Sequence, residues 1–251
     1  MGNTLAVQVG AETILLDVEA DAGNQEGLKN FELWRAETYS TKEPDTLAWI
    51  DTFFRPGDVI YDIGANIGQY SLYAAKRLRG DCQVLAFEPE ALNHAKLNRN
   101  IVLNGLVGTV IPYCLAVTER TGLDRFFVKT FAAGAALHAL HRPVTQGEEP
   151  FPPQNQQGMM GVSLDDLTGR FGLPLPNHIK IDVDGIEDLI VRGAGKTLEG
   201  ASLRTVLVEV YLYKNVAEEI QGALLRHGFA LHNAASIDWK PGTARNLIFV
   251  R

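Results

Sequence analysis

The sequence predicts an α/β protein built around a mostly parallel sheet with helices on both faces. From Asp58 onward, short apolar runs alternate with helix-like stretches, and this alternation is typical of βαβ units. The 251 residues, of which 46% are hydrophobic and 21% charged, are enough for one large domain or two small ones. This ordinary composition excludes disordered, collagen-like and coiled-coil chains.

The first segment of the chain, residues 1–43, precedes this alternation. Apolar residues alternate over residues 5–9 and again over residues 14–18, and Gly10 lies between the two runs. This spacing predicts a small β-hairpin. We therefore expect a hairpin and a helical extension in residues 1–43, followed by the main domain in residues 44–251.

The main domain opens with a helix from about Pro44 to Phe53. Leu47, Ile50 and Phe54 have helical spacing, and a proline suits the first turn of a helix. Apolar runs then predict strands that alternate with helices. The strands are VIYDIG, VLAFE, TVIPYCLAV, HIKIDV and RTVLVEVY, and the helices are QYSLYAAKRL, ALNHAKLNRNIVLN, 186–198 and 216–227.

Two further features complete the predicted domain. The last apolar runs, FALHNA and NLIFVR, are joined by a polar loop without room for a crossover helix, so we expect an antiparallel pair. The segment 145–158 contains three prolines and four glutamines, which predicts a mobile loop. It is either a tolerated surface insertion or a lid over a substrate pocket.

The most specific motif is the glycine turn DIGANIG between the first sheet strand and the next helix. Gly64 and Gly68 let the backbone approach a ligand, and the following helix offers free N–H groups. The dinucleotide pattern G-x-G-x-x-G is absent, because Asp62 stands where its first glycine would be. A carboxylate there repels a pyrophosphate and attracts an ammonium or sulfonium group. S-adenosyl-L-methionine carries both of these cations.

Glu88 supports a nucleoside cofactor. It follows the second strand, about 20 residues beyond the turn, where a carboxylate can accept both ribose hydroxyls of an adenosine. This acid alone does not separate NAD from S-adenosyl-L-methionine, and Asp62 favours the latter. In the alternative interpretation, Gly64 and Gly68 only close a turn and Glu88 is a solvated loop acid.

With these motifs, the sequence resembles the FkbM family of S-adenosylmethionine-dependent methyltransferases. The resemblance rests on DIGANIG, FEPE and KIDVDGIE and covers most of the chain. It implies a class I methyltransferase fold, which is Rossmann-like and has a seven-stranded sheet with one antiparallel strand. It also implies O-methylation of a hydroxyl on a sugar, a polyketide or a related secondary metabolite.

The resemblance also assigns residues to the cofactor. The family's ribose acid corresponds to Glu88, and Glu43 matches a family glutamate that closes over the methionine end. The family signature IDVEG is here IDVDG, with Asp184 where glutamate is common, so any contact that needs the longer side chain is in doubt. The cofactor motif corresponds to Asp62, Gly64, Ala65, Asn66 and Gly68.

Asp182 and Asp184 are the first catalytic candidates. They follow the fourth parallel strand, where open α/β sheets bind ligands, and they share one face if the strand continues to Asp184. Asp182 lies in an apolar run, and we expect burial to raise its pKa and make it a base for an alcohol proton. Alternatively, both acids hold Mg²⁺, or Asp184 caps the next helix. We assign no metal site, because no third ligand is evident.

Glu209, at the end of the fifth strand, is the third catalytic candidate. It matches a family glutamate, and together with Tyr211 it could hold the acceptor, although a charged side chain that escapes into solvent explains it equally well. His138, His141 and His178 are weaker base candidates, because a lone histidine more often has a structural role.

Composition also restricts partners and location. The formal charge is −7, from 23 basic and 30 acidic residues, and the basic residues do not cluster, so we expect no nucleic-acid partner. No apolar stretch is long enough to cross a membrane, and no signal peptide is evident. Cys82 and Cys114 look like small core or strand residues and are too few for a disulfide framework, which predicts a reduced, cytoplasmic protein. The oligomeric state stays open, with a homodimer as one option.

The leading prediction is therefore an O-methyltransferase that acts on a small-molecule or glycan acceptor. A nucleotide-dependent (NAD-type) oxidoreductase is the first alternative, and Asp62 opposes it. A catalytically silent S-adenosylmethionine-binding module is the second alternative. The identity of the acceptor cannot be predicted from fold and cofactor motifs, because it depends on the acceptor pocket.

Overall fold

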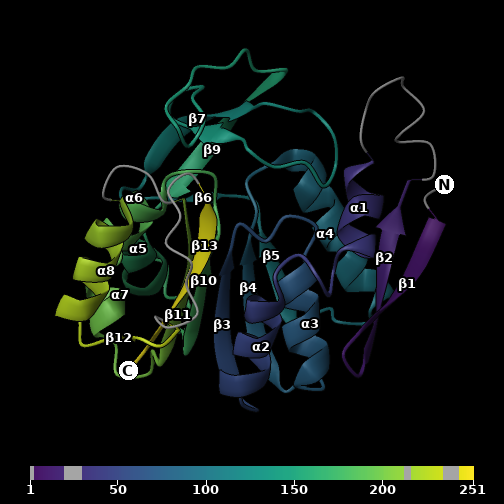
Figure 1. Cartoon of the computed structure of the whole chain (residues 1–251), viewed down its shortest axis with the longest axis horizontal. Coiled ribbons are helices and arrows are strands. Elements are labelled where there is room, and N and C mark those ends of the chain that lie inside the picture. The colour runs from purple at the N-terminus through teal and green to yellow at the C-terminus, as the bar shows by residue number, and fades with distance from the viewer. Residues whose placement is uncertain (1–2, 20–29, 212–215, 234–242) are drawn as a thin grey trace.

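The centre of the molecule is a seven-stranded sheet in the order β12-β13-β11-β10-β3-β4-β5 (Figure 1). The computed structural model describes residues 3–19, 30–211, 216–233 and 243–251. Within the described strands of this sheet, only β13 runs against the others, which confirms the predicted class I methyltransferase topology. The strands are β3 (Asp58–Ile63), β4 (Cys82–Phe87), β5 (Val110–Tyr113), β10 (His178–Ile181), β11 (Thr205–Tyr211), β12 (Ala230–Leu231) and β13 (Ala244–Val250).

Helices cover both faces of this sheet, and alternate residues of each strand reach the two faces. Ile60 packs in the core on one side, whereas Tyr61 and Ile63 pack in the core on the other, as the two-residue period of a strand requires. The first face carries α2 (Pro44–Phe53), α3 (Gln69–Arg77) and α4 (Ala91–Leu103). The second carries α5 (Leu164–Gly169), α6 (Glu187–Arg192), α7 (Gly195–Glu199) and α8 (Val216–Arg226).

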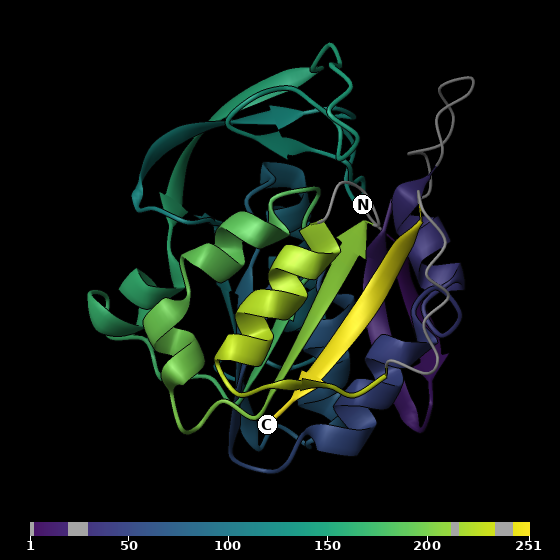
Figure 2. The same cartoon turned by 60° about the vertical axis from the view of Figure 1, so that its left-hand side comes forward.

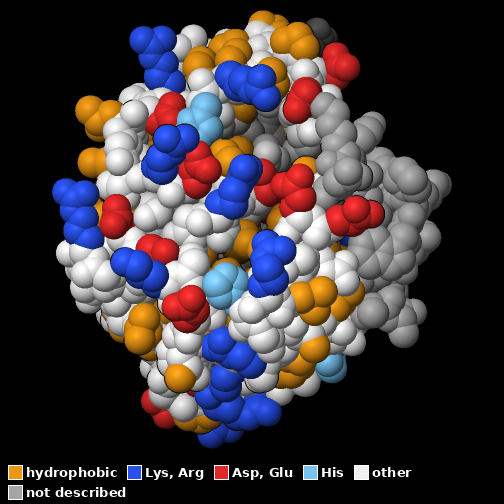
Figure 3. All heavy atoms as spheres, turned by 90° about the vertical axis from the view of Figure 1, so that its left-hand side faces the viewer, with side chains coloured by type: hydrophobic (Ala, Val, Ile, Leu, Met, Phe, Trp, Pro, Cys, Tyr) orange, Lys and Arg blue, Asp and Glu red, His pale blue; other side chains and the backbone are white. Residues whose placement is uncertain are grey.

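The face that carries α5 to α8 is shown as a surface in Figure 3. Acidic and basic side chains are interspersed across its middle, and several basic side chains gather at its lower edge. Within the described residues, no helix combines the length and the apolar character that a membrane crossing requires.

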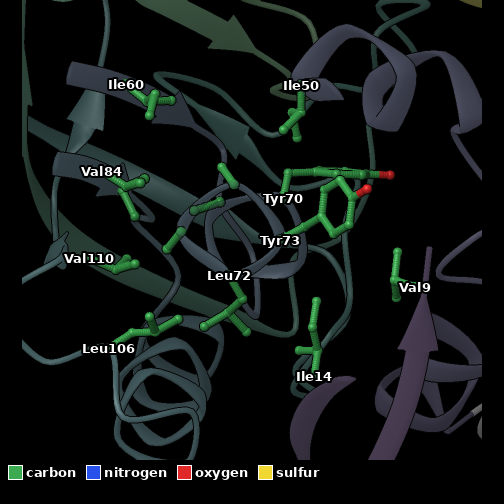
Figure 4. Packing of buried hydrophobic residues seen from close by; sticks show 14 of the residues in the cluster. Val9, Ile14, Ile50, Ile60, Tyr70, Leu72, Tyr73, Val84, Leu106 and Val110 are labelled. Atoms are coloured by element: carbon green, nitrogen blue, oxygen red, sulfur yellow. The ribbon is translucent and has the colours of Figure 1, made fainter. Parts of the chain in front are cut away.

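The predicted N-terminal hairpin is confirmed as β1 (Asn3–Val9) and β2 (Glu12–Val18), followed by α1 (Phe31–Glu37). Figure 4 shows α3 between the hairpin and the sheet, with Leu72 near Ile14 on one side and Ile60 and Val84 on the other. The side chain of Asn100 on α4 also accepts a hydrogen bond from the β2 backbone. The N-terminal segment therefore shares one hydrophobic core with the main domain.

A second, four-stranded sheet was not predicted. It has the order β6-β9-β7-β8 and arches over the carboxyl ends of the parallel strands (Figure 2). The run TVIPYCLAV, predicted as one strand, is divided between β5 and β6 in the two sheets. The strands are β6 (Ala116–Val117), β7 (Gly122–Val128), β8 (Ala139–Leu140) and β9 (Asn155–Val162).

The predicted loop 145–158 is wrong at its end, because residues 155–158 begin β9. These polar residues form a strand because they pair antiparallel with residues 125–128 of β7. No local sequence pattern predicts this pairing. Within the remaining loop, Gln146 reaches the cavity described below. Whether the loop moves as a lid stays a prediction.

The helix predicted over residues 186–198 is also wrong, because it is divided into α6 and α7. The break lies at Gly193, where an added Cβ would come within 2.7 Å of the Thr118 carbonyl oxygen. The backbone beside β6 thus approaches the helix closely at a residue without a side chain.

Candidate active site

A cavity of about 470 Å³ lies at the carboxyl ends of β3, β4, β10 and β11. The chain order of the sheet reverses at β3, because β4 lies on one side of it and β10 on the other. Open α/β sheets bind their ligands at such a switch point. The other walls come from α1 and from residues 126–140 around β7 and β8.

The turn after β3 forms part of the cavity floor through Gly64, Ala65 and Asn66. Gly64 has a φ of +82°, and a Cβ at this position would lie 1.8 Å from the carbonyl oxygen of Asp182. Glycine is therefore required because the turn touches the backbone that follows β10. This contact brings the predicted cofactor turn and the predicted catalytic acids together.

Glu88 also lines the cavity and faces this turn. Its two carboxylate oxygens accept backbone N–H groups, one from Asn66 at 2.7 Å and one from Glu90 at 2.9 Å. Burial raises the pKa of Glu88 to about 7, although both hydrogen bonds lower it. Because each carboxylate oxygen can accept a second hydrogen bond, Glu88 can still bind a pair of hydroxyls.

Two predicted cofactor residues, Gly68 and Asp62, lie outside the cavity lining. Gly68 packs against α4, where a Cβ would meet Leu97 Cδ1 at 2.5 Å. Asp62 is 2% exposed, and its Oδ2 accepts a hydrogen bond of 2.6 Å from the Ser71 hydroxyl. Burial raises the pKa of Asp62, and the charge of Lys180 opposes this shift. Direct contact of either residue with a cofactor stays a prediction.

Glu43 is buried at the start of α2 and is also absent from the lining. Its carboxylate accepts hydrogen bonds from the Lys42 ammonium and from the Thr46 hydroxyl, the latter at 3.2 Å. Lys42 itself lines the cavity, and the charge of Glu43 also raises the pKa values of Lys180 and Glu209. The predicted contact with the methionine end of the cofactor stays a prediction.

Lys180 is the central cation below the cavity. It is 2% exposed on β10, and its Nζ lies 2.7 Å from Oδ2 of Asp182. Burial alone would lower the pKa of Lys180, but the charges of Asp182, Asp62 and Glu43 raise it above its usual value. One buried ammonium group therefore compensates several carboxylates that would otherwise repel each other.

Asp182 and Glu209 both line the cavity, and they differ in protonation. Burial alone would raise the pKa of Asp182, but the positive charges of Lys180 and Lys42 lower it to about 2. The expected increase in this pKa is therefore wrong. The charge of Asp182 and burial raise the pKa of Glu209 well above its usual value. Within this hydrogen-bonded pair, the environment thus favours the ionised form of Asp182 and the protonated form of Glu209.

Asp184 lines the same cavity, but not for the predicted reasons. The strand ends at Ile181, and α6 has Ile186 at its N-cap, so Asp184 neither continues a strand nor caps the helix. Its Oδ2 instead accepts the backbone N–H of His138 at 3.0 Å. Burial and the charge of Asp182 raise the pKa of Asp184 to about 6. This hydrogen bond connects the four-stranded sheet to the end of β10.

The sequence model described as the methyltransferase FkbM domain matches residues 62–231. This match includes the glycine turn, Glu88 and the acids after β10 and in β11. The chain belongs to the FkbM methyltransferase family.

Within the described residues, no group of three His, Cys, Asp or Glu side chains is arranged to hold a metal ion.

Two known methyltransferases are similar to this chain over most of its length. The 31-O-demethyl-FK506 methyltransferase FkbM of Streptomyces tacrolimicus is 28% identical over an alignment of 200 positions, and the match covers 70% of this chain and 74% of that protein. The hexuronic acid methyltransferase AglP of Haloferax volcanii is 27% identical over 180 residues, which cover 72% of this chain and 66% of that protein.

A solved structure supports the fold. The FkbM methyltransferase of Methylobacillus flagellatus superimposes with a TM-score of 0.51 at 12% identity and covers 89% of this chain. The matched region spans 56% of that protein's length.

The FkbM-family site contains a component that sequence reasoning missed. Helix α1 lies outside the matched region, yet Phe31, Trp34 and Arg35 line the cavity. The side chain of Asn30 caps this helix by accepting the Leu33 N–H at 2.9 Å. An asparagine before a helix-like run is a recognised start signal and could have located α1, but nothing in it indicates the cavity.

The three candidate histidines have different environments. His138 lines the cavity, its Nδ1 accepts the Lys129 N–H at 3.2 Å, and burial lowers its pKa to about 4. It is therefore neutral near pH 7, with its proton on Nε2. His178 is buried between Asp58 and Thr205 at the other end of the sheet. His141 is exposed and pairs with Asp124 outside this cavity.

The unfolding free energy of the ligand-free protein should fall by about 2 kcal/mol between pH 6.5 and about 8.5. Burial raises the pKa of Glu187 to about 8 and that of Glu88 to about 7, so the folded state holds protons that the unfolded state has lost. This stabilisation is lost as the pH rises through the folded pKa values. The buried His138 and His178 act in the opposite direction, because burial lowers their pKa values to about 4. Protons then bind the unfolded state more readily, so these two side chains reduce the stability as the pH falls below about 6.5.

Urea unfolding at several pH values measures this slope. Glu187→Gln should remove most of the pH dependence of the unfolding free energy, because a neutral amide cannot titrate. An unchanged slope in this variant would show that the buried Glu187 carboxyl is not responsible.

Both cysteines should titrate as free thiols in the unfolded, non-reduced protein. Cys82 is half-buried, and burial raises its pKa to about 12, whereas Cys114 is exposed rather than in the core or a strand as predicted. In the native protein we therefore expect Cys114 to react with a thiol reagent first and Cys82 only slowly. Failure to detect two thiols after unfolding would contradict the predicted reduced state.

Proposed function

We propose that this chain transfers the methyl group of S-adenosyl-L-methionine to a hydroxyl of a sugar, a polyketide or a related small molecule. The observation that carries this proposal is one cavity that joins the Glu88 carboxylate and glycine turn to the ionised Asp182. The Glu88 carboxylate and the glycine turn suit a nucleoside, and the Asp182 carboxylate suits the proton of an alcohol.

The residues present fit the cofactor. Glu88 has acceptor capacity for the two ribose hydroxyls, and the backbone of Gly64 and Ala65 allows close approach. The carboxylates around Lys180 favour a cationic ligand group over a pyrophosphate. When bound, the cofactor supplies a methyl group that its sulfonium has already activated.

Asp182 and Glu209 act on the acceptor. The ionised carboxylate of Asp182 accepts a hydrogen bond from the acceptor hydroxyl and receives its proton as transfer proceeds. Glu209 keeps its own proton and orients Asp182 through their hydrogen bond. Lys180 prevents the proton from resting on Asp182 before the acceptor binds. Most of the remaining catalysis is the positioning of two reactants.

The acceptor side of the cavity is formed by the four-stranded sheet and its connections. Phe126, Leu137 and Leu140 supply apolar surface there, and the Nε2–H of the neutral His138 is a hydrogen-bond donor. Such a wall suits an acceptor with an apolar face and a few polar groups. The printed names of two relatives, which specify an O-demethyl compound and a hexuronic acid, support an oxygen acceptor.

Two measurements test this proposal. Calorimetric titration should detect S-adenosylhomocysteine but not NADH, and Glu88→Gln should weaken the binding of S-adenosylhomocysteine. Labelled S-adenosyl-L-methionine should then pass its methyl group to a member of a panel of uronic acids, neutral sugars and macrolides. Binding of NADH alone would favour the oxidoreductase alternative. Cofactor binding without transfer to any hydroxyl would favour a silent binding module.

A further inference from the structure

Arg35 is a buried cation without a carboxylate partner. The side chain is 7% exposed, its Nε donates to the Gly134 carbonyl oxygen at 2.6 Å, and Nη1 donates to Gln69 Oε1 at 3.3 Å. Among the described residues, no acidic group forms an ion pair with it, so N–H donors remain on both terminal nitrogens. A buried guanidinium with no carboxylate in direct contact is costly, and such a cost points to a ligand.

The position of Arg35 identifies the part of the cavity that it serves. It lines the cavity beside Gln69, which is the first residue of α3 and directly follows the glycine turn. Gln69 is held in place because its Nε2 donates to the Arg35 carbonyl oxygen at 3.0 Å and its own carbonyl accepts the Tyr39 hydroxyl. Arg35 lines the same cavity as Glu88 and Asp182, and the charges of both carboxylates act on it.

Two other cations of the site already have carboxylate partners. Lys42 is exposed and pairs with Glu43, and Lys180 pairs with Asp182 below the floor. Of the described basic side chains that line the cavity (Arg35, Lys42 and Lys129), only Arg35 is buried. The acidic groups around the site favour an ammonium and a sulfonium but repel a carboxylate. A zwitterionic ligand therefore requires one buried cation here.

We infer that Arg35 binds the carboxylate of the cofactor's methionyl group through its two terminal nitrogens. This inference rests on the proposed use of S-adenosyl-L-methionine. The planar fork of a guanidinium matches a carboxylate with two parallel hydrogen bonds. The N-terminal segment thus takes part in cofactor binding, although it lies outside the region that matches the family model.

The test compares two ligands on two proteins by calorimetric titration. S-adenosylhomocysteine carries the amino-acid carboxylate, and 5′-methylthioadenosine has the same nucleoside without it. Arg35→Gln should lower the affinity for S-adenosylhomocysteine by about 10- to 100-fold and the affinity for 5′-methylthioadenosine by less than about threefold. Arg35→Lys should recover part of the loss, because it keeps the charge without the fork. Arg77→Gln removes an exposed cation that pairs with Asp51 and should change neither affinity.

The outcomes separate this inference from the proposed function. Equal weakening of both ligands would overturn the inference, because Arg35 would then support the site in general. Unchanged S-adenosylhomocysteine binding would also overturn it, because Arg35 would then not hold the carboxylate. If neither ligand binds the wild-type protein, the proposed cofactor itself is wrong.

A further measurement needs no variant and remains decisive if Arg35→Gln fails to fold. Decarboxylated S-adenosylhomocysteine, which keeps the amine, should bind the wild-type protein about 10- to 100-fold more weakly than the parent compound. Equal affinities would overturn the inference.

Discussion

Asp182→Asn should bind S-adenosylhomocysteine with nearly unchanged affinity and transfer methyl groups about 10²- to 10⁴-fold more slowly. Asparagine has nearly the shape of aspartate but cannot receive the acceptor's proton. Because Lys180 and Lys42 hold the pKa of Asp182 at about 2, the carboxylate is ionised throughout the working pH range. Single-turnover transfer to an acceptor found in the panel, with cofactor affinity measured on the same samples, provides the test.

Asp184→Asn is the matched control for this prediction. Asp184 lies two residues away and lines the same cavity, but its Oδ2 already accepts the His138 N–H. An asparagine oxygen can accept the same hydrogen bond, so we expect a much smaller loss of transfer. Inactive Asp184→Asn together with active Asp182→Asn would invert the assignment. If both variants lose activity and added Mg²⁺ changes the rate of the wild-type protein, the metal alternative is favoured.

Lys180→Met should lower the unfolding free energy by about 3–5 kcal/mol near pH 7. The substitution leaves Asp182 and Asp62 without the ammonium group that compensates them in a buried environment. A loss of this size is a large fraction of the roughly 5–15 kcal/mol that stabilises a typical domain. Chemical denaturation of the ligand-free protein measures it.

The pH dependence of this variant distinguishes lost charge compensation from lost packing. Without Lys180 the low pKa of Asp182 should rise and the raised pKa of Asp62 should rise further, so protonation restores stability as the pH falls toward 5. Arg192→Met removes a cation from an exposed pair with Asp188 and should cost no more than about 1 kcal/mol. Equal losses for Lys180→Met at pH 5 and pH 7 would contradict the charge explanation.

Local patterns were sufficient to predict the central fold. The N-terminal hairpin, the helix from Pro44 to Phe53 and the strands of the large sheet were predicted from apolar spacing, prolines and glycines. These signals work because a strand or helix that borders a core repeats its buried positions with a fixed period. The glycine turn and Glu88 were predicted in the same way, because the chain order of a parallel sheet determines which turns share an edge.

The second sheet could not be predicted in this way. Polar residues 155–158 become strand only because β7 offers an antiparallel edge, and the β5–β6 division depends on which sheet each half joins. Pairing between distant segments does not produce a periodic pattern in the sequence of either segment.

For the candidate site, the sequence by itself determined which acids and glycines lie at the carboxyl ends of the central strands. Only the tertiary structure decided their charge states and which side chains share the cavity. Asp182 is ionised because Lys180 and Lys42 are close, and burial, which the sequence does predict, acts in the opposite direction. Arg35 reaches the cavity from a helix that precedes the matched region. The physical reason is that electrostatic energies depend on distances between side chains, which the fold sets and the order of residues does not.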